Sequence, residues 1–245
     1  MKLEIRSGGT QRSAFRFEDD WPIPRTQWTK FYLRIDREAS ESPERSNASE
    51  GELVNAPIAA ESKVSFGAAP PSRPGKMPRG VSFETPPLAE DTEVTGHIVL
   101  NVWVSSTNDD MDIFATIRNI DASGNDVMEM GQMGEPLQCV TKGWLRASHR
   151  KLDKAKSLPY RPYHAHDERL LLEPGKPVEC QVEILATSMV FKKGHKIRLD
   201  ISPADGAGTQ HFTHFHSDYN QGGTSTVHSG GGKDTYLLLP IIPPK

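Results

Sequence analysis

The sequence has little cysteine and no long apolar run. The two cysteines among its 245 residues, Cys139 and Cys180, both stand in apolar contexts. We expect two buried, reduced thiols and no disulfide, which favours a cytoplasmic protein. No stretch approaches the ~18 apolar residues that a membrane-spanning helix needs, and Met1 to Arg6 lacks the apolar core of a secretory signal. Neither a membrane protein nor an exported protein is predicted.

An excess of charge of one sign is also missing. The 29 Lys and Arg residues nearly balance the 32 Asp and Glu residues, so the net charge is -3 and the pI is near 6.3. The basic residues are spread along the chain, and nucleic acid is therefore not a predicted partner. The mean hydropathy of -0.55 is typical of a soluble chain.

Helical periodicity is scarce, whereas alternation with a period of two residues recurs. Val178 to Ile184 alternates apolar and polar residues, and Ile197 to Ile201 does the same. Successive side chains of a strand point to opposite faces, so each run predicts a strand in an antiparallel sheet with one buried face. Many short runs of this kind, with 20 glycines and 19 prolines, predict an all-β fold.

Two irregular segments are expected to interrupt the strands. Residues 27–33 read as a strand, but residues 36–60 are rich in Glu, Ser, Arg and Asn and predict a surface excursion. Residues 68–80 are rich in proline, which cannot donate to a ladder of hydrogen bonds, and they predict a long irregular loop. No repeat divides the chain. We therefore expect one β domain over residues 1–245.

Several short motifs follow one another in order along nearly the whole chain. They are Asp20 to Pro22, Phe83 to Leu88, Asp91 to Gly96, Val102 to Ser106, Met111 to Phe114, Asp121 to Gly124, Gly143 to Arg150, Leu172 to Gly175, Phe191 to Gly194 and Tyr236 to Pro243. In this order they resemble the C-terminal domain of the X-Pro dipeptidyl-peptidase and cocaine-esterase-like (CocE/NonD) serine hydrolases. The resemblance implies a jelly-roll β-sandwich, galactose-binding-domain-like, with long loops and no catalytic residues of its own.

The same resemblance implies a partner for the chain. In that family the catalytic Ser, Asp and His belong to an α/β-hydrolase domain that precedes this one, so we expect that domain to be absent here. The resemblance implies that the chain packs on the α/β-hydrolase domain of its parent protein and helps to wall the pocket for a small acyl or peptide substrate. Apolar contacts would come from Phe66, Pro70, Pro71 and Met77. An exposed interface of this kind also allows a homo-oligomer.

The residues themselves show no serine-hydrolase elbow. The nearest strings are Gly80 to Glu84 and Gly223 to Val227, and neither completes G-x-S-x-G or precedes a helical pattern. The alternation of strands and crossover helices that carries such an elbow is missing as well. We therefore expect no catalytic residue and no cofactor in this chain, while the resemblance implies a parent protein that is a serine hydrolase, either a dipeptidyl-peptidase or an acyl esterase.

Two groups of histidines have spacings that suit metal ligands. His211, His214 and His216 are close enough in sequence to surround Zn²⁺ if the segment is a bent strand. His164 and His166, with Asp167, match the start of a dinuclear hydrolase motif. We expect polar surface loops and no metal in both places, while Zn²⁺ binding by the first group stays open.

Aromatic residues support an alternative function. Jelly rolls can bind sugars by stacking them on exposed rings, and the candidate platforms are Trp21, Trp28, Trp103 and Trp144. No cluster of Asp and Asn for calcium accompanies them. The alternative is therefore a free-standing carbohydrate-binding jelly-roll module.

Overall fold

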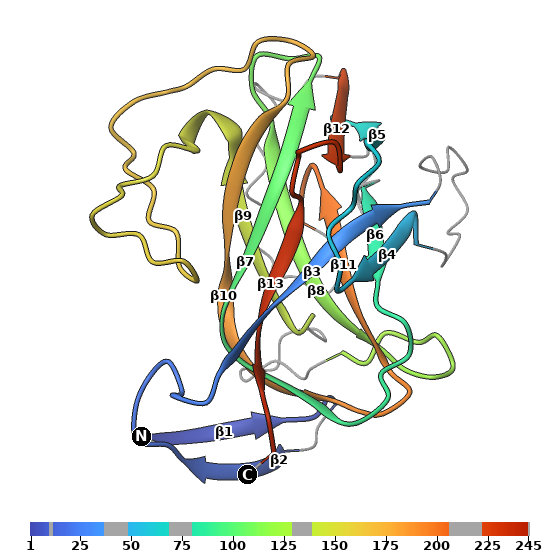
Figure 1. The fold of residues 1–245 in the computed structure, drawn as a ribbon, viewed down its shortest axis with the longest axis vertical. Helices are drawn as coiled ribbons and strands as arrows, with labels where there is room; N and C mark the ends of the chain where they lie inside the picture. Colours follow the sequence, from blue (N-terminus) through green and yellow to red (C-terminus); the bar gives the residue numbers. More distant parts are fainter. Residues whose placement is uncertain (10–11, 37–48, 69–79, 129–138, 206–221, 245) are drawn as a thin grey trace.

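The computed structural model describes residues 1–9, 12–36, 49–68, 80–128, 139–205 and 222–244, which are nearly all strand and loop (Figure 1). The elements are β1 (Lys2–Arg6), β2 (Arg12–Phe17), β3 (Gln27–Ile35), β4 (Gly51–Val54), β5 (Ser62–Gly67), β6 (Val81–Glu84), β7 (Thr92–Ser106), β8 (Asp112–Ile120), β9 (Thr141–Arg146), the 3₁₀ helix η1 (Ala147–His149), β10 (Val178–Phe191), β11 (Lys196–Ser202), β12 (Thr224–Ser229) and β13 (Tyr236–Ile242). Across these ranges, no helix combines the length and the apolar character that crossing a membrane requires. The prediction of an all-β fold is confirmed.

The hydrogen-bonded strands close into a ring. The order around it is β10-β9-β8-β11-β6-β4-β3-β13-β7, and β7 then pairs with β10. Strand β12 pairs with β7 and carries β5 at its other edge, while the β1–β2 hairpin joins β10 through β1. This hairpin lies with both chain termini at one end of the molecule (Figure 1). The two alternating runs of the sequence, now in β10 and β11, are both antiparallel strands, but each pairs with other neighbours.

Strand β10 is longer than the alternation in the sequence predicted, because a bulge lies in its middle. Opposite β7, Ile184 faces Ile98 and Thr187 faces Gly96, so β10 has one residue more than β7 over this interval. The extra residue shifts the phase of the alternation, and the strand continues to Phe191. The buried positions along β10 are Cys180, Val182, Ile184, Thr187, Met189 and Phe191.

Strand β4 corrects the prediction of an irregular excursion over residues 36–60. It pairs antiparallel with β3 and parallel with β6. Gly51 permits the close approach to β3, since a Cβ there would lie 1.8 Å from the carbonyl oxygen of Arg34. Leu53 is 1% exposed and is the buried anchor of the strand. One buried leucine in four residues is too short a pattern for period-two analysis to detect.

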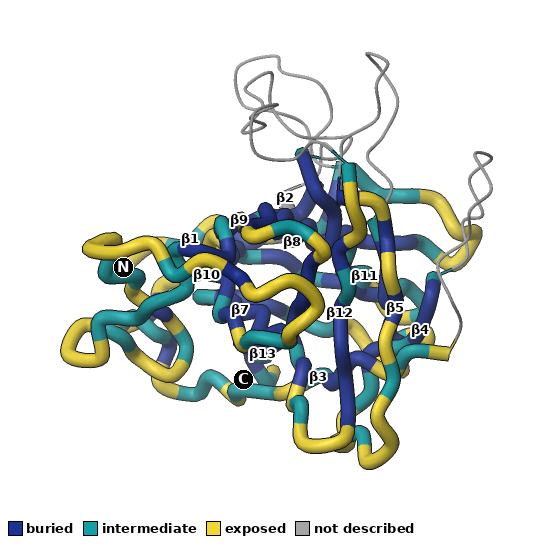
Figure 2. Tube along the Cα trace, turned by 90° about the horizontal axis from the view of Figure 1, so that it is seen from above, coloured by how far each residue is buried: buried dark blue, intermediate teal, exposed yellow. Residues whose placement is uncertain are grey.

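The hydrophobic core fills the inside of the ring. Buried positions follow the strands, whereas exposed positions gather in the connecting segments (Figure 2). Cys139 and Cys180 are both buried and free, as predicted. Burial raises the pKa of both thiols, that of Cys180 to about 12. Both therefore stay protonated and act as small apolar side chains.

Between η1 and β10 the chain leaves the ring as an irregular segment, residues 150–177, called the strap below (yellow to gold in Figure 1). Its Tyr160 ring stacks on Trp28 with a centroid distance of 4.6 Å, and it lies 6.0 Å from the ring of His97. Backbone hydrogen bonds such as that from Ala165 N–H to the Lys151 carbonyl fold the strap on itself. The strap is therefore attached through local contacts and not through a ladder.

Candidate functional site

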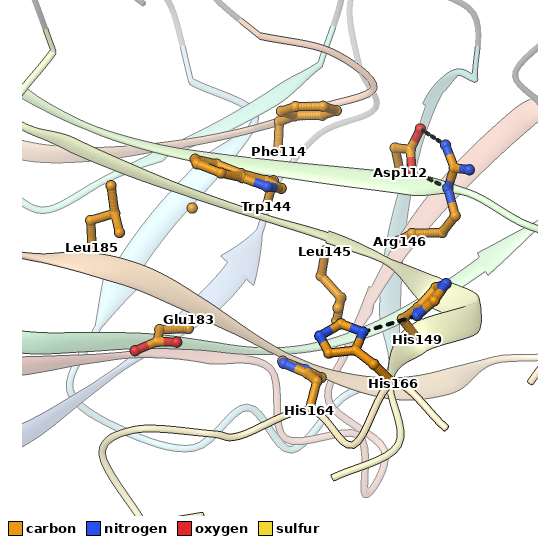
Figure 3. Close-up of a pocket in the computed structure, with 11 residues that line it drawn as sticks. Asp112, Phe114, Trp144, Leu145, Arg146, His149, His164, His166, Glu183 and Leu185 are labelled. Atoms are coloured by element: carbon orange, nitrogen blue, oxygen red, sulfur yellow. Dashed lines mark hydrogen bonds and ion pairs between the residues drawn. The ribbon is translucent and has the colours of Figure 1, made fainter. Parts of the chain in front are cut away.

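A pocket opens where β8, β9 and β10 meet η1 and the strap (Figure 3). Its volume is about 540 Å³, which lies in the range of small-molecule sites. Aromatic and apolar side chains line one end, and imidazole rings from η1 and the strap line the other. Charged groups from β8, β9 and β10 lie between or beside these ends.

The pocket depends on a close approach of β9 and β10 at Gly143. In the register of these strands Gly143 faces Ile184, and a Cβ at Gly143 would lie 2.1 Å from the carbonyl oxygen of Glu183. No other residue type fits this contact without moving a backbone. The glycine thereby places its neighbour Trp144, together with Leu185 of β10, at the same pocket.

An ion pair joins β8 and β9 beside the pocket. Asp112 faces Arg146 in the strand register, and the guanidinium donates to both carboxylate oxygens, with Nε–Oδ1 at 2.7 Å and Nη2–Oδ2 at 2.8 Å (Figure 3). The Asp112 side chain is 8% exposed. A bidentate pair of this kind fixes both side chains, so it shapes the wall of the pocket.

The apolar end of the pocket contains Phe114, Trp144 and Leu185 (Figure 3). Phe114 faces Trp144 across the β8–β9 pair and is buried. Trp144 is 41% exposed and Leu185 is 55% exposed. Leu185 directly follows the buried Ile184 in β10, so it points outward beside this end. The result is an apolar surface at this end of the pocket.

The histidine end contains three imidazole rings. His149 Nδ1 lies 3.0 Å from His166 Nδ1, and the two ring centroids are 5.2 Å apart (Figure 3). The ring of His164 lies 6.0 Å from that of His166. His166 has a positive φ of 53°, a conformation uncommon for residues other than glycine, and it turns the strap toward η1.

Two groups in the pocket have shifted pKa values. Burial raises the pKa of the Glu183 carboxyl, and the charge of Arg161 partly offsets this effect. Burial lowers the pKa of His164, while a hydrogen bond to the Gln181 backbone opposes the shift. Perturbed groups inside a pocket indicate a site that can bind polar ligands.

The pocket offers ring faces, charged groups and imidazole nitrogens. Within the described ranges, no group of three His, Cys, Asp or Glu side chains is arranged to hold a metal ion. The described residues that line the pocket include neither serine nor cysteine, so it has no nucleophile of the usual kind. Ring faces, a carboxyl group and imidazole nitrogens remain.

A serine does lie beside a histidine elsewhere in the chain. Ser105 Oγ on β7 is 2.8 Å from His228 Nε2 on β12, and the two residues are 5% and 7% exposed. The nearby carboxylate of Glu61 forms an ion pair with Lys233, and no carboxylate bonded to the His228 ring is found in the described residues. A catalytic triad needs an accessible nucleophile and an oriented base. The pair therefore satisfies two buried polar groups.

The described part of the chain contains one of the predicted interface residues, Phe66. Its side chain is 6% exposed and belongs to the core cluster, so the structure gives it a packing role. The other predicted residues lie outside the described residues: Pro70, Pro71, Met77, His211, His214 and His216.

The remaining sequence candidates occupy ordinary structural positions. The string Gly80 to Glu84 runs into β6 and Gly223 to Val227 runs into β12, and in the described ranges neither is followed by a helix. Trp144 is the most exposed tryptophan, and the other three are half-buried. Period-two analysis missed the pocket itself, although the motif Gly143 to Arg150 contains a large part of one wall.

Comparison with protein families gives a match over nearly the whole chain. The model of the X-Pro dipeptidyl-peptidase C-terminal non-catalytic domain matches residues 1–238. A putative serine esterase of Mycobacterium bovis is 27% identical over 207 residues, which cover 79% of this chain and 31% of that protein. The cocaine esterase of Rhodococcus sp. is 24% identical over 260 residues, covering 93% of this chain and 40% of that protein. The chain thus spans well under half the length of these relatives.

In solved structures, too, the chain matches part of a longer protein. A CocE/NonD family hydrolase from Staphylococcus aureus superposes with a TM-score of 0.82 and 26% identity, covering 99% of this chain and 41% of that chain. An aminopeptidase from a marine sediment Thaumarchaeota archaeon superposes with a TM-score of 0.61 at 16% identity, which indicates a shared fold. In both proteins the matching fold is part of a longer chain.

Proposed function

The chain belongs to the family of X-Pro dipeptidyl-peptidase C-terminal non-catalytic domains, and from this premise we propose that it is the accessory domain of a serine hydrolase. In this proposal it packs on the α/β-hydrolase domain of its parent protein and shapes the substrate pocket, while nucleophile and base come from that domain. One observation supports this most directly. Nearly the whole chain superposes on less than half of a CocE/NonD hydrolase, so the same fold serves there as one part of an enzyme.

The proposal extends to several finer points. We interpret the closed ring of strands as a jelly-roll sandwich, galactose-binding-like, that forms one domain. The substrate of the parent enzyme is a small acyl ester or an X-Pro peptide, and the location is cytoplasmic, as the reduced cysteines suggest. Phe66, Pro70, Pro71 and Met77 remain the proposed contacts with the hydrolase domain.

Co-purification tests the packing directly. The chain is expressed together with the α/β-hydrolase portion of the parent protein, with an affinity tag on one partner. We expect a complex of one copy each, and a change in the rate of p-nitrophenyl ester hydrolysis when the chain is present. Separate elution with an unchanged rate would contradict the proposal.

The apolar end of the pocket supports a second candidate function. Trp144 is 41% exposed beside a cavity that also holds the Glu183 carboxyl, and ring faces with nearby polar groups are the usual means of binding sugars. A carbohydrate-binding module would show calorimetric heats with neutral oligosaccharides, and the substitution Trp144→Ala would remove them. If the wild-type chain gives no heat with these oligosaccharides, carbohydrate binding is excluded and only the accessory-domain proposal remains.

A further inference from the structure

The strap meets η1 through two imidazole rings whose contact depends on protonation. His149 Nδ1 and His166 Nδ1 are 3.0 Å apart. One of these nitrogens must donate and the other must accept, so at least one ring has to be neutral. Two protonated rings would direct N–H groups at each other. Uptake of a proton by both rings therefore breaks the contact.

A third ring adds to this dependence. His164 lies 6.0 Å from His166, and its Nε2 is buried with no hydrogen-bond partner among the described residues. Burial lowers the pKa of His164 most, a hydrogen bond to the Gln181 backbone opposes this, and the two neighbouring rings lower it further. A proton on His164 would thus be poorly solvated and close to a second charge.

Carboxylates near the rings are already engaged. On β8, Asp112 is paired with Arg146 of β9. On the strap, Asp167 and Glu168 both lie beside Lys151, with O–Nζ distances of 3.1 and 2.6 Å. These acids have their own cations, so they do not compensate new charge on the imidazole rings.

The acid on β10 does not compensate the charge either. Glu183 lines the same pocket, and burial raises the pKa of its carboxyl, which favours the neutral form in acid. Arg161 of the strap also acts on Glu183. Added protons on the three histidines therefore repel one another, with little relief from the acids that the described strands and the strap place around them.

We propose that His149, His164 and His166 form a proton-operated latch, which holds the strap against η1 and β9 at neutral pH and releases it in acid. Two of these residues belong to the strap and line the pocket. Release therefore withdraws one wall of the pocket and uncovers its histidine end, while the ring of strands stays folded. This inference goes beyond the accessory role and does not depend on it.

Amide hydrogen exchange at pH 7.5 and pH 5.5 tests the latch on the full chain. Rates are normalised to the intrinsic rate at each pH, and peptides from residues 150–177 are compared with peptides from β7. We expect the strap to lose protection by about tenfold in acid, which is the change expected when one side-chain hydrogen bond is lost. Protection in β7 should stay constant. Equal strap protection at both pH values would overturn the proposal.

The variant His166→Asn separates the latch from general acid effects. Asparagine tolerates the positive φ of this position, and its amide lies near the place of Nδ1, so the contact with His149 is kept without a titrating ring. We expect this variant to lose most of the acid response. His195→Asn is the matched control, because His195 bonds Asn119 away from the pocket, and it should respond like wild type.

A second variant is needed in case the substitution His166→Asn itself detaches the strap. If His166→Asn leaves the strap unprotected already at pH 7.5, His149→Asn removes the same charge from the side of η1. Loss of the acid response in either variant supports the latch. A full, wild-type acid response in both would show that other groups control the strap.

Discussion

The strap leads directly into β10, which pairs with β7, yet different interactions hold the strap and these two strands in place. The strands share a long antiparallel ladder, and the inward side chains of β10 are buried. The strap has one core residue, Leu172, which is 4% exposed. Otherwise it relies on stacking at Tyr160, on short backbone contacts and on ion pairs such as Lys151–Asp167, whose side chains are 40% and 57% exposed. Exposed pairs of this kind contribute little to stability. The ladder therefore determines the fold, and the strap adds one wall to the pocket that the strands form.

Substitutions in the ladder should affect global stability, whereas substitutions in the strap should affect local stability. Substitutions in the ladder should lower the free energy of unfolding of the whole chain, because the ladder closes the ring. Substitutions in the strap should mainly change local opening, since such segments open without global unfolding. The experiments below test this difference, beginning with the largest expected effect.

Truncation of Phe191 should have the largest effect. Phe191 is fully buried near the end of β10, and Phe→Ala substitutions in cores cost about 3–5 kcal/mol. The matched control is Leu185→Ala on the same strand, which is 55% exposed and should cost less than about 1 kcal/mol. Urea denaturation measures both. If both variants lose a similar free energy of unfolding, the buried face of the ladder does not contribute most of the stability.

The substitution Gly143→Ala should have the second-largest effect on stability. The Cβ of Gly143→Ala would meet the Glu183 carbonyl oxygen at 2.1 Å, so β9 and β10 must separate, at a cost of about 2–3 kcal/mol. Gly67→Ala is the control, because nothing lies within 4 Å of a Cβ at that position. Thermal denaturation of both variants gives the comparison. An equal melting temperature for the two would contradict the close approach.

Removal of the Tyr160 ring should affect the strap more than the fold. The stack on Trp28 contributes on the order of 1 kcal/mol, so Tyr160→Ala should change the free energy of unfolding only slightly. Hydrogen exchange in residues 150–177 should nevertheless rise clearly. Tyr163→Ala, at a ring that is 44% exposed, serves as the control. A cooperative loss of protection in β7 and β10 would mean that the strap is part of the core.

Mild acid should have the smallest effect on global stability. Burial lowers the pKa of His228, so the folded chain binds fewer protons than the unfolded chain near pH 6.5. The contribution of neutral His228 to the free energy of unfolding is therefore complete above pH 6.5, and it is lost as the pH falls below this value. Urea denaturation between pH 7.5 and 5.5 should show a modest decline. The decline should shrink in His228→Gln, whose amide can replace Nε2 toward Ser105, and a rise in stability on acidification would contradict the sign.

The sequence predicted the strands well wherever alternation was unbroken. The run from Val178 to Ile184 and the run ending at Ile201 are both strands with a buried inner face. The second half of β10 was missed because a bulge changes the phase after Ile184, and β4 was missed because it has one strong anchor, Leu53. Both misses arise from pairing with other strands, which a single segment does not reveal.

The pocket was harder to predict than the fold. The sequence indicated the surface position of His164 and His166 and the outward face of Glu183. It did not indicate that His149 lies beside His166, because that contact depends on how the strap folds back toward η1. Contacts between an irregular segment and a strand leave no periodic signal. Family resemblance, and not local pattern, identified the motif that contains His149.

Labelling with a serine-directed fluorophosphonate, combined with an ester hydrolysis assay, tests the central claim that this chain is not itself catalytic. We expect the purified chain to hydrolyse neither p-nitrophenyl esters nor X-Pro p-nitroanilides, and to take up no label, because its one Ser–His pair in the described residues is buried and lacks a bonded carboxylate. Turnover that the fluorophosphonate abolishes, with the label on Ser105 and with loss of both in Ser105→Ala, would contradict the account.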